Sequence, residues 1–168
     1  KGKEVVGRDE AFDRIKAAVD AREAGADILI LARTDARHQH GLTEAIDRAA
    51  KFKELGADIL FVEAPKSVTE MRTVCAELSG PKMANIVEGG ETPDLSPDEL
   101  KDIGYQIAAY PLSLMAAAMK AMVETLQSMK AGVPRDDKLM AWPDLRQRIG
   151  FDDYYAESER YASSRRDS

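Results

Sequence analysis

Two short apolar segments share the sequence GADIL, which begins at Gly25 and again at Gly56, and each runs on into different polar residues. The first segment leads to Arg33-Thr34-Asp35, and the second leads to Glu63. The guanidinium group of an arginine is a planar fork that suits a carboxylate or a phosphate. The glutamate can act as a base, orient a metal-bound water or neutralise the arginine. Together these residue types predict a pocket for a small anionic substrate.

Two further apolar segments end in polar residues of a similar kind. Asn85 can donate a hydrogen bond to the developing oxygen anion of an enolate. Glu88-Gly89-Gly90 follows it, and the two glycines either cradle a phosphate or form a plain turn. The last segment ends in Tyr110 and Ser113. An amide beside an arginine and several acids again favours a small anionic substrate.

Each of these residues also has a structural interpretation, which the sequence leaves open. In that interpretation Arg33 and Glu63 form an ion pair on neighbouring strands, and Asp35 caps the turn that follows it. His38 and His40 then lie in a polar loop, where such a pair without further ligands is more often solvated than bound to a metal.

Four βα units are expected to position these residues. Continuous apolar sequences over 28–31 and 59–62 are typical of strands buried on both faces of a parallel sheet. Further strands are expected over 82–87 and 105–110. Helices are expected over 10–23, 43–55, 67–78 and from 96 onwards, with Ser67 and Ser96 as N-caps and Gly104 as the stop of the last one. Right-handed crossovers of this kind build a doubly wound sheet or a (β/α)8 barrel. In both folds ligands bind at the carboxyl ends of the strands.

The C-terminal part of the chain is expected to be helical. A long helix rich in alanine and methionine is predicted over 114–129, a turn over 132–137 and a last helix over 152–160. The apolar stripe of the long helix is broader than one buried face needs, and it consists of Leu114, Met115, Ala118, Met119, Met122 and Leu126.

The composition of the chain argues against several classes of partner. A formal net charge of −6 does not suit a nucleic-acid interface, and no apolar run approaches the roughly 20 residues of a membrane-spanning helix. The single cysteine, Cys75, is expected to be a small core residue. A single cysteine excludes an internal disulfide and suits a reducing, cytoplasmic compartment. The opening Lys1-Gly2-Lys3 lacks an initiator methionine, so we expect an interior segment of a longer protein.

Five short motifs are characteristic in their order and spacing. They are Ala32-Arg33-Thr34-Asp35-Ala36, Gly41-Leu42 with Glu44-Ala45-Ile46, Gly56-Ala57-Asp58, Phe61-Val62-Glu63-Ala64 and Ala84-Asn85-Ile86. Together they resemble the isocitrate lyase/phosphoenolpyruvate mutase superfamily, over about residues 1–155. This resemblance implies an α/β fold, the (β/α)8 or TIM barrel, with Mg2+ or Mn2+ at the strand ends.

The resemblance covers only the second half of such a barrel. It implies that residues 1–113 are strands 5–8 with their helices, and that residues 114–168 are extra C-terminal helices and a tail. The catalytic cysteine and most metal ligands are then expected in an N-terminal half that precedes Lys1. The chain is thus expected to be a fragment that its own N-terminal half completes. Members of the superfamily exchange C-terminal helices between subunits, so the expected assembly is a homotetramer.

The resemblance also implies which residues form the site. Arg33 matches the arginine that binds a substrate carboxylate. Glu63 matches a substrate-side glutamate of the lyases and is the expected catalytic residue of this chain. The stretch Asn85, Ile86 and Val87 matches residues that contact the substrate, and no metal ligand is assigned within the chain.

The implied substrate is a small 2-hydroxy or 2-oxo dicarboxylate. Ala116 and the Trp142-Pro143 region replace two arginines expected in 2-methylisocitrate lyases, and the stretch 84–93 is most similar to the dimethylmalate lyase and petal-death-protein branch. The implied function is a Mg2+-dependent carbon–carbon lyase or hydrolase that works through an enolate intermediate. Two alternatives stay open: phosphonate chemistry on the same barrel, against which Glu63 argues, and a non-catalytic half-barrel that only binds a ligand.

Overall fold

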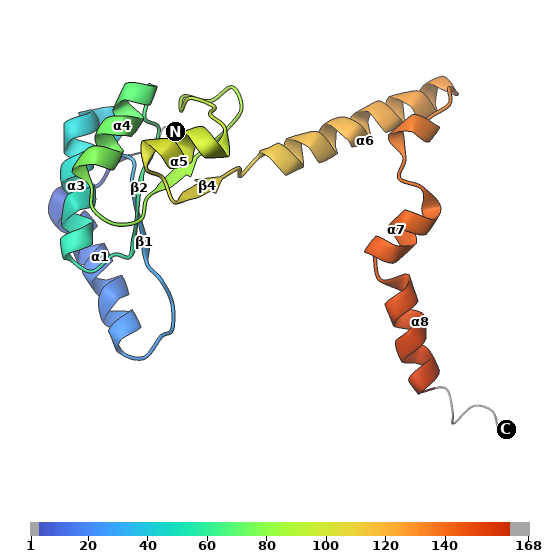
Figure 1. The fold of residues 1–168 in the computed structure, drawn as a ribbon, viewed down its shortest axis with the longest axis horizontal. Coiled ribbons are helices and arrows are strands. Elements are labelled where there is room, and N and C mark those ends of the chain that lie inside the picture. Colours follow the sequence, from blue (N-terminus) through green and yellow to red (C-terminus); the bar gives the residue numbers. More distant parts are fainter. Residues whose placement is uncertain (1–3, 162–168) are drawn as a thin grey trace. The chain divides into compact units, whose positions relative to one another are not determined.

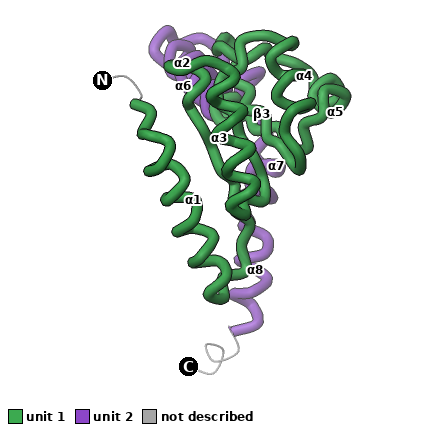
Figure 2. Tube along the Cα trace, turned by 90° about the vertical axis from the view of Figure 1, so that its left-hand side faces the viewer, with its two compact units in different colours: residues 1–114 green, residues 115–168 purple. Residues whose placement is uncertain are grey.

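Strands and helices alternate in the first part of the chain, and helical segments follow (Figure 1). The computed structural model describes residues 4–161. Its elements are α1 (Arg8–Glu23), β1 (Leu31–Thr34), α2 (Ala36–His40), α3 (Leu42–Glu54), β2 (Ile59–Val62), α4 (Val68–Glu77), β3 (Met83–Asn85), α5 (Pro97–Ile103), β4 (Ile107–Ala109), α6 (Ser113–Ala131), η1 (Asp136–Lys138), α7 (Trp142–Arg148) and α8 (Phe151–Arg160). The chain divides between residues 114 and 115 into two compact units (Figure 2).

The strands of the first unit are parallel and follow chain order. β1 pairs with β2 so that Arg33 lies opposite Phe61, and β3 pairs with β4 in the same sense. A bridge between Leu60 and Lys82 links β2 to the residue just before β3. The carboxyl ends of the strands therefore lie at one edge, as the predicted βα units require.

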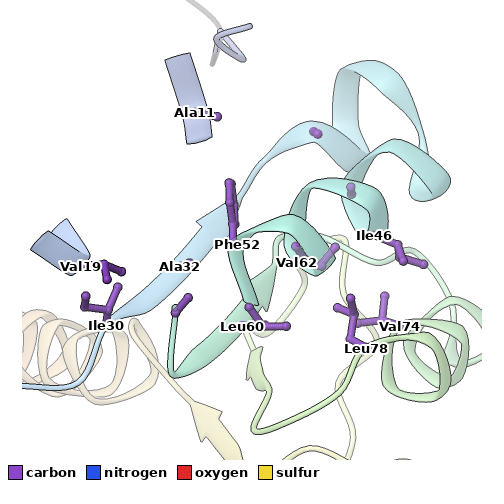
Figure 3. Close-up of a cluster of buried hydrophobic side chains, with 14 residues drawn as sticks. Ala11, Val19, Ile30, Ala32, Ile46, Phe52, Leu60, Val62, Val74 and Leu78 are labelled. Atoms are coloured by element: carbon purple, nitrogen blue, oxygen red, sulfur yellow. The ribbon is translucent and has the colours of Figure 1, made fainter. Parts of the chain in front are cut away.

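The hydrophobic core lies between the strands and their helices. Figure 3 shows Leu60 and Val62 of β2 in one cluster with Phe52 of α3 and with Val74 and Leu78 at α4. A second cluster packs behind β3 and contains Met71, Ala84, Ile86, Leu100, Ile103 and Tyr105. Helices therefore cover one face of the strands, which fixes their carboxyl ends relative to one another.

The expectation of burial on both faces is confirmed for β2, where Leu60, Phe61 and Val62 are all buried, and is wrong for the segment over 28–31. The opposite face of the strands is partly open at β1 and β4. Leu31 in β1 is 39% exposed and Ile107 in β4 is 37% exposed. β1 also begins later than the apolar run over 28–31 predicts. The reason is a side-chain contact, because the Asp58 carboxylate accepts a hydrogen bond from the backbone N–H of Ile30 at 2.8 Å and takes the place of a strand partner there.

Helix ends follow local signals, as expected from the sequence. Ser67 Oγ accepts a hydrogen bond from the third residue of α4 at 3.1 Å, and Ser96 and Glu99 form a reciprocal capping box at the start of α5. Gly104 ends α5 with a φ of 115°, and a Cβ there would lie only 3.2 Å from the Cβ of Cys75. Cys75 itself is half-buried against the second cluster, and burial raises the pKa of its thiol.

The second unit leaves much apolar surface exposed. Met115, Met119, Met122 and Leu126 of α6 are each more than half exposed. α7 was not expected, because its seven residues are too few and too mixed in polarity to show a helical period. In the described part of the chain, no helix combines the length and the hydrophobicity that crossing a membrane requires.

Candidate active site

A cavity of about 320 Å³ lies at the carboxyl ends of β1, β2 and β3. It is lined by Asp35, His38, Glu63, Ala64, Asn85, Val87, Gly90, Glu91 and Thr92. These residues are far apart in the sequence, and the parallel pairing of the strands brings them together. Polar residues at the ends of separate strands thus share one cavity, which is the arrangement that ligand sites of α/β folds use.

Arg33 does not line this cavity, but it connects two acids that do, and with Asp35 it lines a smaller cavity of about 170 Å³. Its Nε donates to Asp35 Oδ1 at 2.8 Å, and its Nη2 lies 3.2 Å from Glu63 Oε1. The guanidinium also lies over the ring of Phe61, 4.9 Å from the ring centroid. The ion pair considered from the sequence is therefore present. The side chain is still 40% exposed, so an anion from solvent can reach it.

The short helix α2 corrects two sequence-based interpretations. His38 and His40 lie on this helix rather than in a loop, and only His38 lines the cavity. Asp35 stands at the N-cap position but makes no capping hydrogen bond, because its carboxylate pairs with Arg33 instead. Thr34 Oγ1 accepts from the first N–H of the helix at 3.2 Å. Five residues are too few to show an apolar period, so no pattern in the sequence predicts α2.

The turn after Glu63 has an unusual backbone. Ala64 has a φ of 56° and is the only described residue other than glycine with a positive φ. A side chain in this region of φ costs on the order of 1 kcal/mol, and such residues concentrate at functional sites. The ladder between β1 and β2 ends one residue earlier, where the N–H of Glu63 donates to the carbonyl of Thr34 at 3.0 Å. Nothing in the sequence around Ala64 indicates this conformation.

The loop after β3 forms another wall of the cavity. The N–H of Gly90 donates to the carbonyl of Val87 at 2.8 Å, so the glycine pair forms a turn. A Cβ at Gly90 would lie 2.9 Å from that same carbonyl oxygen, which explains why a residue without a side chain stands there. Glu88 is exposed and accepts a hydrogen bond from the Ser113 hydroxyl, which lowers the pKa of its carboxyl. Sequence reasoning did not single out Glu91 or Thr92, because neither forms part of a spacing pattern.

The expected substrate-contact stretch begins at the last residue of β3, and its side chains point in two directions. Asn85 and Val87 line the cavity. The side chain of Ile86 points the other way and is fully buried in the second core cluster. Alternation along an extended chain accounts for this split, since neighbouring side chains point to opposite faces.

The described residues do not by themselves fit the Mg2+ site that the resemblance implies. Within residues 4–161 there is no group of three or more histidine, cysteine, aspartate or glutamate side chains that could hold a metal ion. Two of the acids at the cavity, Asp35 and Glu63, are instead engaged with Arg33.

Known proteins are similar to this chain in sequence and in fold. The phosphoenolpyruvate phosphomutase family matches residues 1–130. The 2,3-dimethylmalate lyase of Eubacterium barkeri is 38% identical, over 98% of this chain and 57% of the relative. The petal death protein of Dianthus caryophyllus is 37% identical, over 96% and 51%. The structure of oxaloacetate acetylhydrolase with the inhibitor 3,3-difluorooxalacetate has a TM-score of 0.86 at 31% identity, over 96% of this chain and 56% of that chain.

The chain thus spans about half the length of the curated relatives it matches. Within that half, the sequence alignment and the structural superposition each cover nearly the whole of this chain. Since the family match alone covers far more than half of the 168 residues, the chain belongs to the phosphoenolpyruvate phosphomutase family of the isocitrate lyase/phosphoenolpyruvate mutase superfamily.

Proposed function

We propose that the natural protein containing this chain is a Mg2+-dependent lyase or hydrolase that cleaves a carbon–carbon bond in a small 2-hydroxy or 2-oxo dicarboxylate. The observation that carries the proposal is the strand-end cavity, where the acids held by Arg33 face Asn85 in a volume of about 320 Å³. That volume suits a small acid. The relatives named above support the same class of reaction, because one is a dimethylmalate lyase and another an oxaloacetate acetylhydrolase.

Each polar residue has a definite part in the proposed reaction. Arg33 binds one substrate carboxylate, which then competes with Asp35 and Glu63 for the N–H groups of the guanidinium. Asn85 donates to the oxygen that becomes the enolate anion as the carbon–carbon bond breaks. Glu63 takes up the substrate hydroxyl proton in a lyase or orients water in a hydrolase. Val87 forms an apolar wall, and Ile86 supports the strand from behind.

We further propose that residues 1–113 are the second half, strands 5–8, of a (β/α)8 barrel. Parallel strands in chain order with helices on one face support this, as does the open opposite face at Leu31 and Ile107. The relatives are about twice as long as this chain. In this proposal the remaining half supplies most ligands of the Mg2+ or Mn2+ cofactor and the catalytic cysteine.

The proposed assembly is a homotetramer in which residues 114–168 dock on a neighbouring subunit. The exposed methionines of α6 support this, because a soluble protein rarely leaves such a stripe uncovered. The aromatic residues of α8 add to it, with the rings of Phe151 and Tyr155 stacked 6.0 Å apart.

A substrate panel tests the proposed activity. The natural protein would be incubated with Mg2+ and with dimethylmalate, oxaloacetate, 2-methylisocitrate or phosphonopyruvate, and release of pyruvate, acetate or oxalate would be followed. We expect turnover of a four- to six-carbon dicarboxylate and its loss in Glu63→Gln. Turnover of phosphonopyruvate alone would establish the phosphonate alternative, and binding of an acid without turnover would establish the non-catalytic one.

A further inference from the structure

An ion pair that sequence reasoning did not identify joins α2 to α4, the helices that follow β1 and β2. Arg37 on α2 donates from Nε to Glu70 Oε2 at 2.9 Å and from Nη2 to Glu70 Oε1 at 2.5 Å. The two residues are 33 positions apart, and their side chains are only 15% and 22% exposed. Such a two-point contact fixes orientation as well as distance, in contrast to a single contact between exposed side chains.

Glu70 is itself held in place by the backbone. Its Oε2 accepts a hydrogen bond from the N–H of Lys66 at 2.8 Å. Its own N–H donates to Ser67 Oγ, so the residue is fixed in the first turn of α4. The hydrogen bond from Arg37 also lowers the pKa of the Glu70 carboxyl, which keeps the pair charged. Arg37 therefore binds a rigid partner, and the pair ties α2 to the start of α4.

This connection lies where the strands no longer hold the chain together. The ladder of β1 and β2 ends with the bond between Glu63 and Thr34, and the two segments then separate. One segment passes through the strained Ala64 towards α4, and the other enters α2. The cavity residues Asp35, His38, Glu63 and Ala64 all lie in these two diverging segments.

Arg33 also links the two segments, but it does so as the proposed ligand of a substrate carboxylate. A substrate carboxylate at Arg33 would compete with the carboxylates of Asp35 and Glu63 and so weaken that link. Arg37 and Glu70 line neither this cavity nor the one at Arg33, so a substrate carboxylate at Arg33 would not compete for their ion pair.

We propose that Arg37 and Glu70 are positioning residues: their ion pair holds the segment after β1 against the segment after β2 and so keeps Asp35 and Glu63 in reactive geometry while Arg33 binds substrate. This inference rests on the proposed function for its reaction, and on the structure alone for the contact. Neither residue touches the substrate, and both act through the backbone of the neighbouring segments.

The test uses the natural protein and four variants. These are Arg37→Gln, Glu70→Gln, the double variant with both changes, and the charge-exchanged pair Arg37→Glu with Glu70→Arg. Lys51→Gln is the matched control, because it breaks an exposed pair with Glu54 on α3, and neither residue lines this cavity or the one at Arg33. Kinetics, thermal melting and hydrogen exchange of residues 35–38 and 63–66 would be measured for each.

We expect each single variant to lower kcat about tenfold with little change in KM, because orientation acts in the transition state more than on binding. The double variant should be no worse than either single variant, and the charge-exchanged pair should recover part of kcat. Hydrogen exchange should accelerate in the two segments and not elsewhere, and the control should behave as wild type. Unchanged kcat despite faster exchange, or losses that multiply in the double variant, would overturn the inference.

Binding of oxalate provides a readout that does not depend on turnover. Oxalate resembles the planar enolate of a 2-oxo acid, so its affinity should fall several-fold in Arg37→Gln and not in the control. A wild-type protein that turns over no acid would contradict the proposed function but not the positioning inference. The positioning inference would then fail only if Arg37→Gln binds oxalate as tightly as wild type does, or if the wild type does not bind it.

Discussion

Arg33 is the residue for which the structural and the functional interpretations differ most clearly. We predict that Arg33→Lys in the natural protein lowers kcat/KM at least tenfold, about 1.4 kcal/mol, because an ammonium group cannot reproduce a bidentate contact. Its circular dichroism should stay native, because a lysine can still pair with Asp35 or Glu63. Unchanged kinetics with a lower melting temperature would show instead that the contact only stabilises the fold.

Glu44 gives a prediction about acid stability. Hydrogen bonds from Arg8, and next from Arg48, lower the pKa of the Glu44 carboxyl from 4.5 to about 2. A pKa that is lower in the folded state stabilises the fold above pH 4.5, and this contribution disappears as the pH falls towards 2. Glu44→Gln should therefore be less stable than wild type at neutral pH and approach it near pH 2.

Urea unfolding of the natural protein at several pH values measures this difference. Glu10→Gln is the matched control, because Glu10 pairs with Arg14 on an exposed helix surface where an ion pair contributes little. If the wild-type and Glu44→Gln stabilities stayed equally far apart from pH 7 to pH 2, the ion pair around Glu44 would not be the cause.

At the scale of elements, the turn between β2 and α4 is the most constrained segment of the site. Its Ala64 has a φ of 56°, which a β-branched residue adopts only with strain. We predict that Ala64→Val lowers stability by about 1–2 kcal/mol and lowers kcat. Ala64→Gly should stay within about 0.5 kcal/mol of wild type, because relief of strain offsets the greater freedom of the unfolded chain. Equal melting temperatures for the two variants would argue that Ala64 is not strained in solution.

At the scale of the whole molecule, the C-terminal helices carry many exposed apolar side chains. The apolar side chains of α6 and the tyrosines of α8 are exposed, and Tyr154 is 66% exposed. We predict that truncation of the natural protein after Gly132 converts the oligomer into smaller species in sedimentation, since the proposed docking segment includes α7 and α8. A truncated protein that keeps its original mass class would show that these helices do not hold subunits together.

The sequence by itself determined much of the fold, because the signals that carry it are local. The caps at Ser67 and Ser96 and the stop at Gly104 set helix boundaries through neighbouring residues, and the structure confirms them. The motifs in the sequence also indicated membership of the superfamily, because they keep their order and spacing. The family match confirms this membership. The site residues assigned by resemblance remain predictions, although Glu63 and Asn85 do line one cavity.

The tertiary structure decided what depends on residues that are distant in sequence. It showed that Ile86 faces the core, that Asp35 pairs with Arg33 instead of capping a helix, and that α2 exists at all. It also showed the pair of Arg37 with Glu70, for which no spacing rule exists because the partners lie 33 residues apart. A cap or a turn is favoured by its immediate neighbours, whereas an ion pair or a strained φ persists only when several packed elements hold both sides in place.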